Sequence, residues 1–285
     1  MPATRECQFC SNPLPRSASL CPHCGRPGLY PNVYDADDSA ERAALERRYQ
    51  AALTKSANRG ADDELKAFEA AVANSKAVIA RSSGELLRLA MSDHEIYATF
   101  YQLIEGSVRA SASDQWDFRR QVADAALFPG YFKHIRFAAL SLDGAGLSTY
   151  GACSIVLRDD MIAHRSSVIE ENSVIFVERH GLAKKKGAVP PGYRAPWPDR
   201  AKVCVAKLHS SVDATTTQDE YCRLLMREGA TSELHEFVEG HVFGPITVRT
   251  IEQVSVSKRR KRADNVNIGR LREELGKFGV KVREV

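Results

Sequence analysis

The sequence predicts an α+β fold, in which a small metal-binding segment and a helical segment precede a half of the chain that is rich in strands. Three observations predict it. Paired cysteines occupy the N-terminus, helical apolar spacing follows them, and alternation of apolar and polar residues begins near Phe132. A chain of 285 residues can bury a core of this kind. The expected divisions are residues 1–28, 35–128, 129–257 and 258–285.

Four cysteines lie close together at the N-terminus and form two Cys-x2-Cys pairs: Cys7, Cys10, Cys21 and Cys24. Paired cysteines at this spacing in a reducing compartment are better explained as metal ligands than as disulfides. Four thiolates suit tetrahedral Zn2+, and Gly25 supplies a permissive turn after the second pair. His23 is an alternative ligand, although its place inside that pair favours a solvent-facing side chain. The zinc is expected to be structural, in a ribbon that binds nucleic acid, binds protein or caps a domain.

Composition and charge argue against a membrane-spanning or secreted protein. The formal net charge is +4, and residues 258–285 carry more Lys and Arg than Asp and Glu, whereas residues 35–128 show the reverse. No apolar run approaches the length of a membrane span, and the N-terminus lacks the apolar core of a signal peptide. The sequence therefore predicts a soluble, cytoplasmic protein without a membrane partner.

The segment after the cysteines predicts four helices. The first runs from cap candidates at residues 37–39 to Gly60, and the second carries an apolar face from Leu65 to Ile79. The third starts at the box Ser92 to Glu95, and the fourth spans Asp114 to about Phe128. His94 and Trp116 are interpreted as a first-turn polar residue and a packing aromatic, without a functional role.

The second half of the chain predicts mainly strands. Expected strands are HIRFAALSL, YGACSIVL, SVIFVE and KVCVAKL, followed by two strands in HEFVEGHVFGPITVRTIEQV. Expected helices are TQDEYCRLLMREG and NIGRLREELGKFGVKV. The stretch RHGLAKKKGAVPPGYRAPWPDRA is too long for an ordinary connection, which predicts a mobile functional loop or an insertion.

Three segments carry a family resemblance. In order and spacing, IRFAALSL, STYGACSIVLRDDMIAHRSS and EGHVFGPITVRTI resemble the ADP-ribosyltransferase superfamily, as found in bacterial toxin-like and effector proteins. The resemblance covers about Phe132 to Ser257 and leaves out the cysteines and the predicted helices. It implies a split pair of antiparallel sheets that holds the nicotinamide end of NAD in a cleft, with a catalytic glutamate at the start of a strand.

The glutamate that the resemblance selects is Glu239. Cleavage of the nicotinamide glycosidic bond passes through an oxocarbenium-like state, and a carboxylate that accepts the ribose 2′-OH stabilises the developing positive charge. Many members that modify arginine or asparagine carry Glu or Gln two residues earlier, but here that position is Phe237. Glu236 lies one step away and, on a strand, would point to the opposite face.

Two sets of NAD-binding residues fit the resemblance. One branch of the superfamily implies Arg136 with Ser148 and Thr149, and the other implies His134 with Tyr150. An arginine can hold a phosphate bidentately, while His134 and Tyr150 could hold the ribose and stack on nicotinamide. We favour His134 and Tyr150 beside the glutamate. Strand alternation places His134 and Arg136 on the same face.

The resemblance also implies partners. These are NAD, a macromolecular acceptor that is protein or nucleic acid, and an antitoxin or inhibitor in a toxin-antitoxin or phage-defence setting. A competing hypothesis is a non-enzymatic protein that binds nucleic acid through the zinc ribbon and the basic run, Lys258 to Arg262. A cysteine nucleophile is a poor third, since Cys153, Cys204 and Cys222 lie inside predicted strands or helices.

Overall fold

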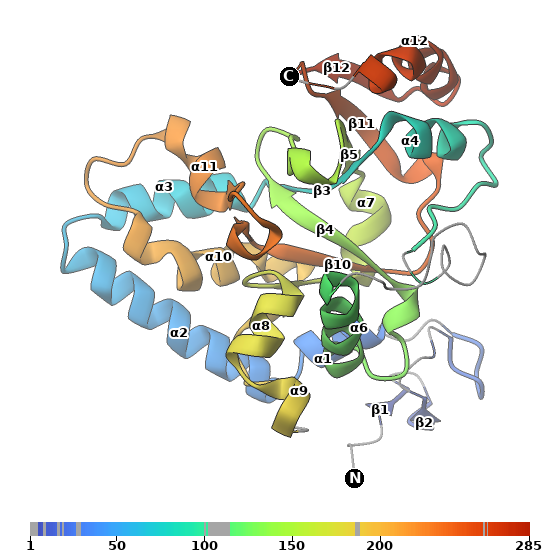
Figure 1. Cartoon of the computed structure of the whole chain (residues 1–285). Helices are drawn as coiled ribbons and strands as arrows, with labels where there is room; N and C mark the ends of the chain where they lie inside the picture. Colours follow the sequence, from blue (N-terminus) through green and yellow to red (C-terminus); the bar gives the residue numbers. More distant parts are fainter. Residues whose placement is uncertain are drawn as a thin grey trace.

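A computed structural model of the chain (Figure 1) describes residues 5–7, 10–15, 18, 20–26, 30–99, 101, 115–185, 189–258, 260 and 262–285. Its centre is an eight-stranded sheet in the order β12-β11-β5-β3-β4-β10-β6-β7, antiparallel except for the β11–β12 pair. The strands are β3 (Lys76–Arg81), β4 (Ile135–Ser141), β5 (Cys153–Leu157), β6 (Ser166–Ile169), β7 (Arg194–Pro196), β10 (Glu239–Phe243), β11 (Ile251–Val256) and β12 (Lys281–Glu284). The predicted α+β class is confirmed.

The sheet divides between β3 and β4. These two strands pair at only three positions, Lys76 with Ser141, Ala77 with Leu140 and Val78 with Ala139. Beyond them β3 continues against β5, while β4 continues against β10. The sheet is therefore continuous, but its two four-stranded halves diverge where β3 and β4 separate. We call this place the fork.

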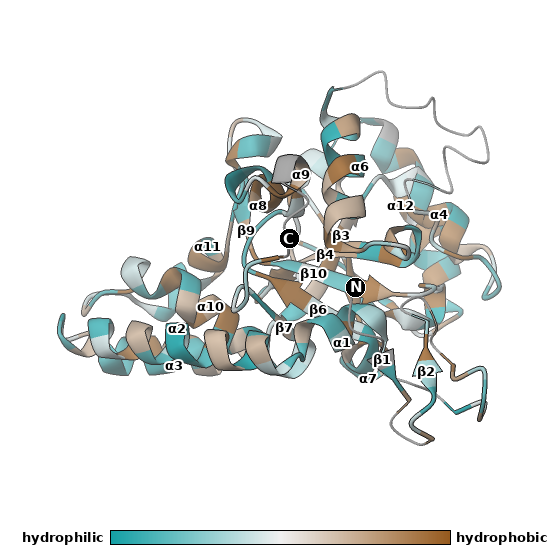
Figure 2. Ribbon diagram, turned by 90° about the horizontal axis from the view of Figure 1, so that it is seen from below, coloured by the Kyte–Doolittle hydropathy of each residue, from teal (hydrophilic) through white to brown (hydrophobic). Residues whose placement is uncertain are grey.

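Helices cover both faces of the half that contains β4, β10 and β6. Figure 2 shows these strands between α6 and α8 on one side and α2 and α3 on the other, while α4 and α12 lie beside the other half (Figure 1). The helices are α1 (Pro31–Ala36), α2 (Ser39–Ala57), α3 (Asp62–Val72), α4 (Ser83–Ala90), α6 (Gln115–Leu127), α7 (Asp159–Ile162), α8 (Ser173–Arg179), α9 (Leu182–Lys185), α10 (Arg200–Leu208), α11 (Tyr221–Leu225) and α12 (Arg262–Gly276).

Several expected elements are confirmed. Asp38 caps α2 by accepting the backbone N–H of Ala40, and α6 occupies most of the predicted fourth helix. Strands β4, β5 and β10 lie where alternation predicts them. Two short hairpins complete the strands: β1 (Arg5–Glu6) with β2 (Pro13–Leu14), and β8 (Met226–Arg227) with β9 (Glu236–Phe237).

The expectation for residues 65–79 is wrong at its end. Helix α3 stops at Val72, and Ile79 belongs to β3. The chain turns at Asn74 and Ser75, and a strand buried on both faces reads as a continuous apolar run that resembles a helix face. The predicted helical segment thus contributes a central strand to the sheet, next to the fork.

The third expected helix does not begin at residue 92 as predicted, although Tyr101 is helical. Residues 92–99 are irregular, because Asp93 pairs with Arg249 and the backbone N–H of Tyr97 donates to the carbonyl of Ile246. These long-range bonds hold the segment against the loop before β11. Residues 100 and 102–114 lie outside the described part of the chain, which includes the remaining positions of that expected helix.

Two expected strands, SVIFVE and KVCVAKL, are helices. In α8 the side chain of Asn172 accepts the backbone N–H of Val174, an N-cap that overrides the strand preference of the β-branched residues. Helix α10 is buried on nearly all sides between the sheet and the helices α2 and α3, so it lacks the polar stripe that identifies a helix. The predicted helix at 217–229 is reduced to α11.

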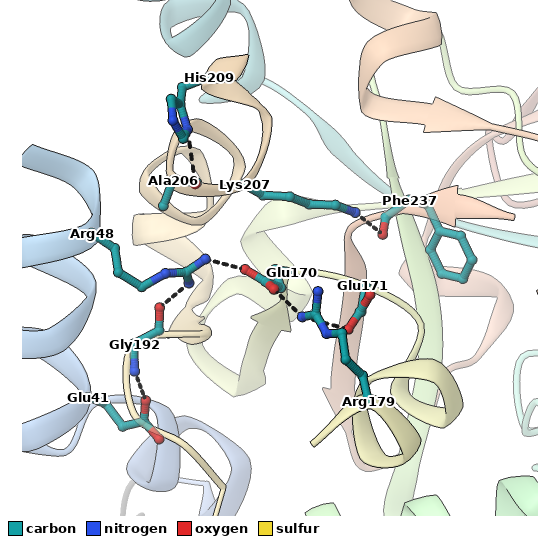
Figure 3. Close-up of polar contacts among 10 residues, drawn as sticks. All are labelled: Glu41, Arg48, Glu170, Glu171, Arg179, Gly192, Ala206, Lys207, His209 and Phe237. Carbon is teal, nitrogen blue, oxygen red and sulfur yellow. Dashed lines mark hydrogen bonds and ion pairs between the residues drawn. The ribbon is translucent and has the colours of Figure 1, made fainter. Parts of the chain in front are cut away.

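In its described part, the long stretch after α8 is bound to α2 by hydrogen bonds and an ion pair. Glu41 on α2 accepts the backbone N–H of Gly192 at 2.7 Å and pairs with Arg194 at 2.6 Å. Arg48 donates to the carbonyl of Gly192, as Figure 3 shows. These bonds place β7 at the edge of the sheet, which corrects the expectation of a mobile loop for residues 189–196. None of the helices that the structure describes combines the length and apolar character that a membrane crossing requires.

Candidate active site and metal centre

A cavity of about 400 Å3 lies at the fork. Residues 78–81 of β3 and 135–139 of β4 form two of its walls, so it occupies the space that opens as the strands separate. Other walls come from residues 97–99 and Tyr101, from helix α6, and from residues 146–147 and 149–150. Aromatic side chains are prominent in its lining: Tyr97, Tyr101, Trp116, Phe137, Tyr150 and Phe237.

Glu239 is the first residue of β10 and lines this cavity with 3% of its surface exposed. The hydroxyl of Ser173 donates to its Oε1, and His241 Nε2 lies 3.0 Å from the same oxygen. Among the residues that the structure describes, Oε2 has a single weak contact, from the backbone N–H of Ser173 at 3.5 Å. The carboxylate is therefore anchored through one oxygen, and the other retains capacity to accept a ligand hydroxyl.

The contacts of His241 exclude a Ser-His-acid triad. In such a triad the hydroxyl and the carboxylate contact different ring nitrogens. Here Ser173 Oγ lies 3.3 Å from Nε2, the same nitrogen that Glu239 contacts. The ring packs edge-on against Phe128 and Phe137. Ser173 and His241 thus position the carboxylate of Glu239.

Tyr150 lies across the cavity, in the wall formed by the turn Ser148–Tyr150. Burial raises the pKa of its phenol, which Arg120 opposes and Glu239 reinforces. The next residue, Gly151, has a φ of +148°, and a Cβ there would lie 2.1 Å from the carbonyl carbon of Arg81. The glycine of the STYG stretch therefore permits the end of β3 to touch the turn that presents Tyr150.

Arg136 and His134 do not occupy equivalent positions. Arg136 lines the cavity, and it pairs with Val242, so its side chain leaves the sheet on the face opposite to Glu239. Burial and Arg165 lower the pKa of its guanidinium to about 10. His134 is exposed in a 3-10 turn that ends before β4, does not line the cavity and stacks near Phe243. The alternation argument fails because His134 precedes the strand.

Ser148 and Thr149 bind a protein carboxylate. Their hydroxyls and backbone N–H groups all donate to Glu228, in the segment that follows β8. These four bonds lower the pKa of Glu228 against the opposing effect of its burial. Thr149 still lines the cavity, whereas Ser148 does not. Their main role in the structure is to fasten the turn beside Tyr150 to the β8–β9 hairpin.

Helix α6 brings charged residues that sequence reasoning missed. Asp117, Arg120 and Asp124 follow helical spacing and all line the cavity. The guanidinium of Arg120 lies 4.2 Å from the centre of the Phe137 ring. Burial disfavours its charge, but Asp124 and Glu239 outweigh this and raise its pKa. Polar residues on one face of a predicted helix were the available signal.

The two glutamates near the start of β10 differ in surroundings. Glu236 is exposed on β9 and pairs with Arg227 at 2.6 Å. Glu239 is buried in the cavity wall. The two residues lie on different strands, β9 paired with β8 and β10 paired with β4 and β6, so the expectation that they occupy opposite faces of one strand is wrong. Phe237 is buried against Ala139 and Leu147 and lines the cavity, so the position two residues before Glu239 presents an apolar ring.

The four N-terminal cysteines form a cluster that could hold a metal ion. The sulfurs of Cys7, Cys10, Cys21 and Cys24 all lie within 4.8 Å of one another. Two of the distances are 3.7 Å, between Cys7 and Cys24, and 3.6 Å, between Cys10 and Cys21. Four sulfurs at the usual Zn–S distance of about 2.3 Å around a tetrahedral ion would be about 3.8 Å apart, which fits this donor set.

The two cysteine pairs share one backbone geometry. The N–H of Ser11 donates to the carbonyl of Cys7, and the N–H of Gly25 donates to the carbonyl of Cys21, at 2.8 Å in both cases. Both Ser11 and Gly25 have left-handed backbone angles, with φ of 54° and 68°. The role expected for Gly25 is confirmed, and Ser11 performs it in the first pair at some conformational cost.

The basic run is partly engaged within the chain. Arg260 pairs with Glu284 at 3.0 Å and donates to Asn265, while Lys258 and Arg262 are exposed. Arg259 and Lys261 lie outside the described residues. A contact to an external phosphate would have to compete with Glu284 for Arg260.

Comparison with protein families and with curated proteins finds no match. No protein-family model matches the chain, and no curated protein matches it. The resemblance of the three segments IRFAALSL, STYGACSIVLRDDMIAHRSS and EGHVFGPITVRTI to ADP-ribosyltransferases therefore remains a prediction. The residues of the cavity and of the cysteine cluster are the basis on which a function is inferred below.

Proposed function

We propose that the protein is an NAD-dependent ADP-ribosyltransferase of the toxin or effector kind, with Glu239 as its catalytic carboxylate. One observation carries the proposal. Glu239 is a buried carboxylate at the start of β10, without a Lys or Arg ion pair among the described residues, in the wall of a cavity at the fork. A charge in such a place is costly unless it serves a ligand.

The chemistry suits this carboxylate. Breaking the bond between ribose C1′ and the nicotinamide nitrogen develops positive charge on the ribose, and nicotinamide leaves as a neutral molecule. A carboxylate oxygen that accepts the 2′-OH stabilises that charge more strongly in the transition state than in the ground state. The second oxygen of Glu239, with its single weak protein contact, is the atom that would do so.

The cavity also supplies groups that could hold the two ends of NAD. Its volume of about 400 Å3 lies within the ordinary range for small-molecule sites. Tyr150 and Trp116 offer aromatic faces for a nicotinamide or adenine ring. Arg81 is a lining cation suited to the pyrophosphate, while Arg136 lines the cavity with its side chain on the sheet face opposite to Glu239. Of the two residue sets that the resemblance implies, Tyr150, Thr149 and Arg136 lie at the cavity and are retained in the proposal.

Two further components complete the proposal. The four N-terminal cysteines bind one structural zinc ion, and the acceptor of ADP-ribose is a macromolecule, either protein or nucleic acid. An antitoxin or inhibitor is the expected regulatory partner, since an enzyme that consumes NAD harms the cell that makes it.

The proposal is tested by incubating the full chain with NAD labelled in the adenosine part, together with cell extract. We expect label to become covalently attached to protein, RNA or DNA, with one nicotinamide released for each label transferred. Separate digestion by protease, ribonuclease and deoxyribonuclease identifies the acceptor class. If NAD stays intact in the presence of extract, the proposed activity is wrong.

A further inference from the structure

The cavity contains a second buried carboxylate besides Glu239. The side chain of Asp124, on α6, has no exposed surface and lines the cavity. Its Oδ2 accepts the hydroxyl of Tyr101 at 2.8 Å and lies 3.7 Å from Arg120 Nε. Its Oδ1 is buried and has no hydrogen-bond partner in the described part of the chain. A buried acceptor in this state has capacity to bind a ligand hydrogen.

The groups around Asp124 come from three elements. Burial raises the pKa of its carboxyl to about 6, Arg120 and the hydroxyl of Tyr101 act to lower it, and Glu239 on β10 raises it further. Glu239 has a different environment, with Ser173 and His241 as its partners. Two carboxylates whose surroundings differ in this way within one cavity are suited to different roles in catalysis.

We propose that Asp124 is the general base that accepts the proton of the acceptor group, and that this acceptor is a neutral O–H or N–H nucleophile. The inference rests on the proposed function. As the acceptor atom bonds to ribose C1′, the bond from C1′ to the nicotinamide nitrogen breaks and its electron pair leaves with nicotinamide. The acceptor proton moves to Oδ1 of Asp124.

The class of acceptor follows from the charges around Asp124. A cationic guanidinium acceptor needs an unopposed carboxylate beside it, but the negative charge of Asp124 is already opposed by Arg120. A hydroxyl, a carboxamide or a ring N–H has no such requirement and needs only a base for its proton.

The test compares nucleophiles that need a base with one that does not. Wild type, Asp124→Asn, Glu239→Gln and the exposed control Glu236→Gln are given NAD in water, in aqueous methanol and with sodium azide. Nicotinamide and the three ADP-ribose products are quantified. Azide is already anionic and has no proton to lose, so attack by azide does not require a base.

For Asp124→Asn we expect hydrolysis and methanolysis to fall about a hundredfold or more, the usual contribution of a general base. Azidolysis should stay within about threefold of wild type, and Glu239→Gln should lose all three products. Equal losses with all nucleophiles, or no loss with any, would overturn the role of Asp124 while leaving the proposed transferase in place. Absence of NAD turnover by wild type would overturn both.

A second variant guards against a folding defect in Asp124→Asn. Tyr101→Phe keeps the carboxylate and removes the hydrogen bond that lowers its pKa. The rate of hydrolysis in wild type should rise with pH around a midpoint of about 6 and then level off. In Tyr101→Phe that midpoint should move to higher pH. An unmoved midpoint would contradict the assignment of the base.

Discussion

Two buried glutamates, one at the start of β10 and one directly after β6, show how the same charge can have different uses. Glu170 follows the last residue of β6, Ile169, which is the register partner of Glu239 on β10. Each glutamate has 3% of its surface exposed. Glu170 is held by Arg48 at 2.6 Å and Arg179 at 2.5 Å, from α2 and α8 (Figure 3). Glu239 has a serine hydroxyl and a histidine instead.

The difference separates a structural charge from a candidate catalytic one. Two guanidiniums compensate the charge of Glu170 and tie α2 and α8 to the sheet, so little capacity remains for a ligand. Glu239 has no Lys or Arg within ion-pair distance among the described residues, interacts with Arg120 only at longer range, and opens on a cavity. Burial alone does not mark a carboxylate as a candidate for function, whereas burial at a cavity without a close cation partner does.

The largest expected effect is that of removing the metal ion. Removal should not change the surroundings of Glu170 or Glu239. We expect one zinc ion per chain on the four N-terminal cysteines, because apparent free energies of about 10 to 16 kcal/mol accompany structural zinc binding. Chelation should unfold the ribbon and leave the sheet intact, as followed by backbone NMR. Freshly purified protein that contains no zinc by elemental analysis would contradict this prediction.

The second prediction compares how much Glu170 and Glu239 each contribute to the free energy of unfolding. Glu170→Gln removes the carboxylate that Arg48 and Arg179 share, but both arginines are partly exposed and Arg179 keeps Glu171, so the free energy of unfolding should fall by about 1.5 to 3 kcal/mol. Glu239→Gln should change it by about 1 kcal/mol or less, since no Lys or Arg lies within ion-pair distance of Glu239 among the described residues. Urea unfolding of both variants measures the difference. Equal losses would mean that Glu239 is as structural as Glu170.

The third prediction concerns another buried carboxylate, Asp124, and how it changes the stability of the fold as pH changes. The pKa of Asp124 is raised from 3.8 to about 6 by burial, so below pH 4 both folded and unfolded chains are protonated there. Above that, the unfolded chain ionises first, and the folded state is increasingly disfavoured until pH 6, after which the penalty is constant. Asp124→Asn removes the penalty, worth about 3 kcal/mol at most. The variant should therefore gain stability over wild type as pH rises from 4 to 7, and a constant difference would contradict this.

The smallest effect concerns the basic run. Neutralising its five Lys and Arg residues should lower the slope of log K against log salt for nucleic acid by roughly 0.7 to 0.9 per lost phosphate contact. Arg260 should contribute least, because Glu284 already pairs with it. A slope that does not change would mean that the run only faces solvent.

Sequence reasoning located the parts of the site that lie on regular strands. The start of β10 and the strands β4 and β5 were predicted because alternation is a local signal, whereas Tyr150 was expected on a strand and lies in the turn before β5. The same reasoning placed Glu236 and Glu239 on opposite faces of one strand, whereas they lie on two strands, β9 and β10, of different sheets. It also predicted the cysteine cluster, whose spacing encodes its geometry.

The remainder depends on contacts that no local pattern encodes. Helices α8 and α10 read as strands because their exposure is set by neighbours far away in the chain. The fork could not be predicted, since β3 comes from a segment that reads as a helix face. Asp124 and Ser173 enter the site through packing of α6 and α8 on the sheet, so their sequence positions gave no sign of it.

The measurement that tests the central claim most directly is nicotinamide release from NAD by Glu239→Gln, with Glu236→Gln as the matched control. The glutamine keeps the size of Glu239 but removes the charge that stabilises the transition state, so we expect a loss of about a hundredfold to a thousandfold with little change in NAD affinity. Glu236→Gln should behave as wild type, since that residue is exposed and pairs with Arg227. Wild-type release by Glu239→Gln, or a larger loss in Glu236→Gln, would contradict the assignment of Glu239.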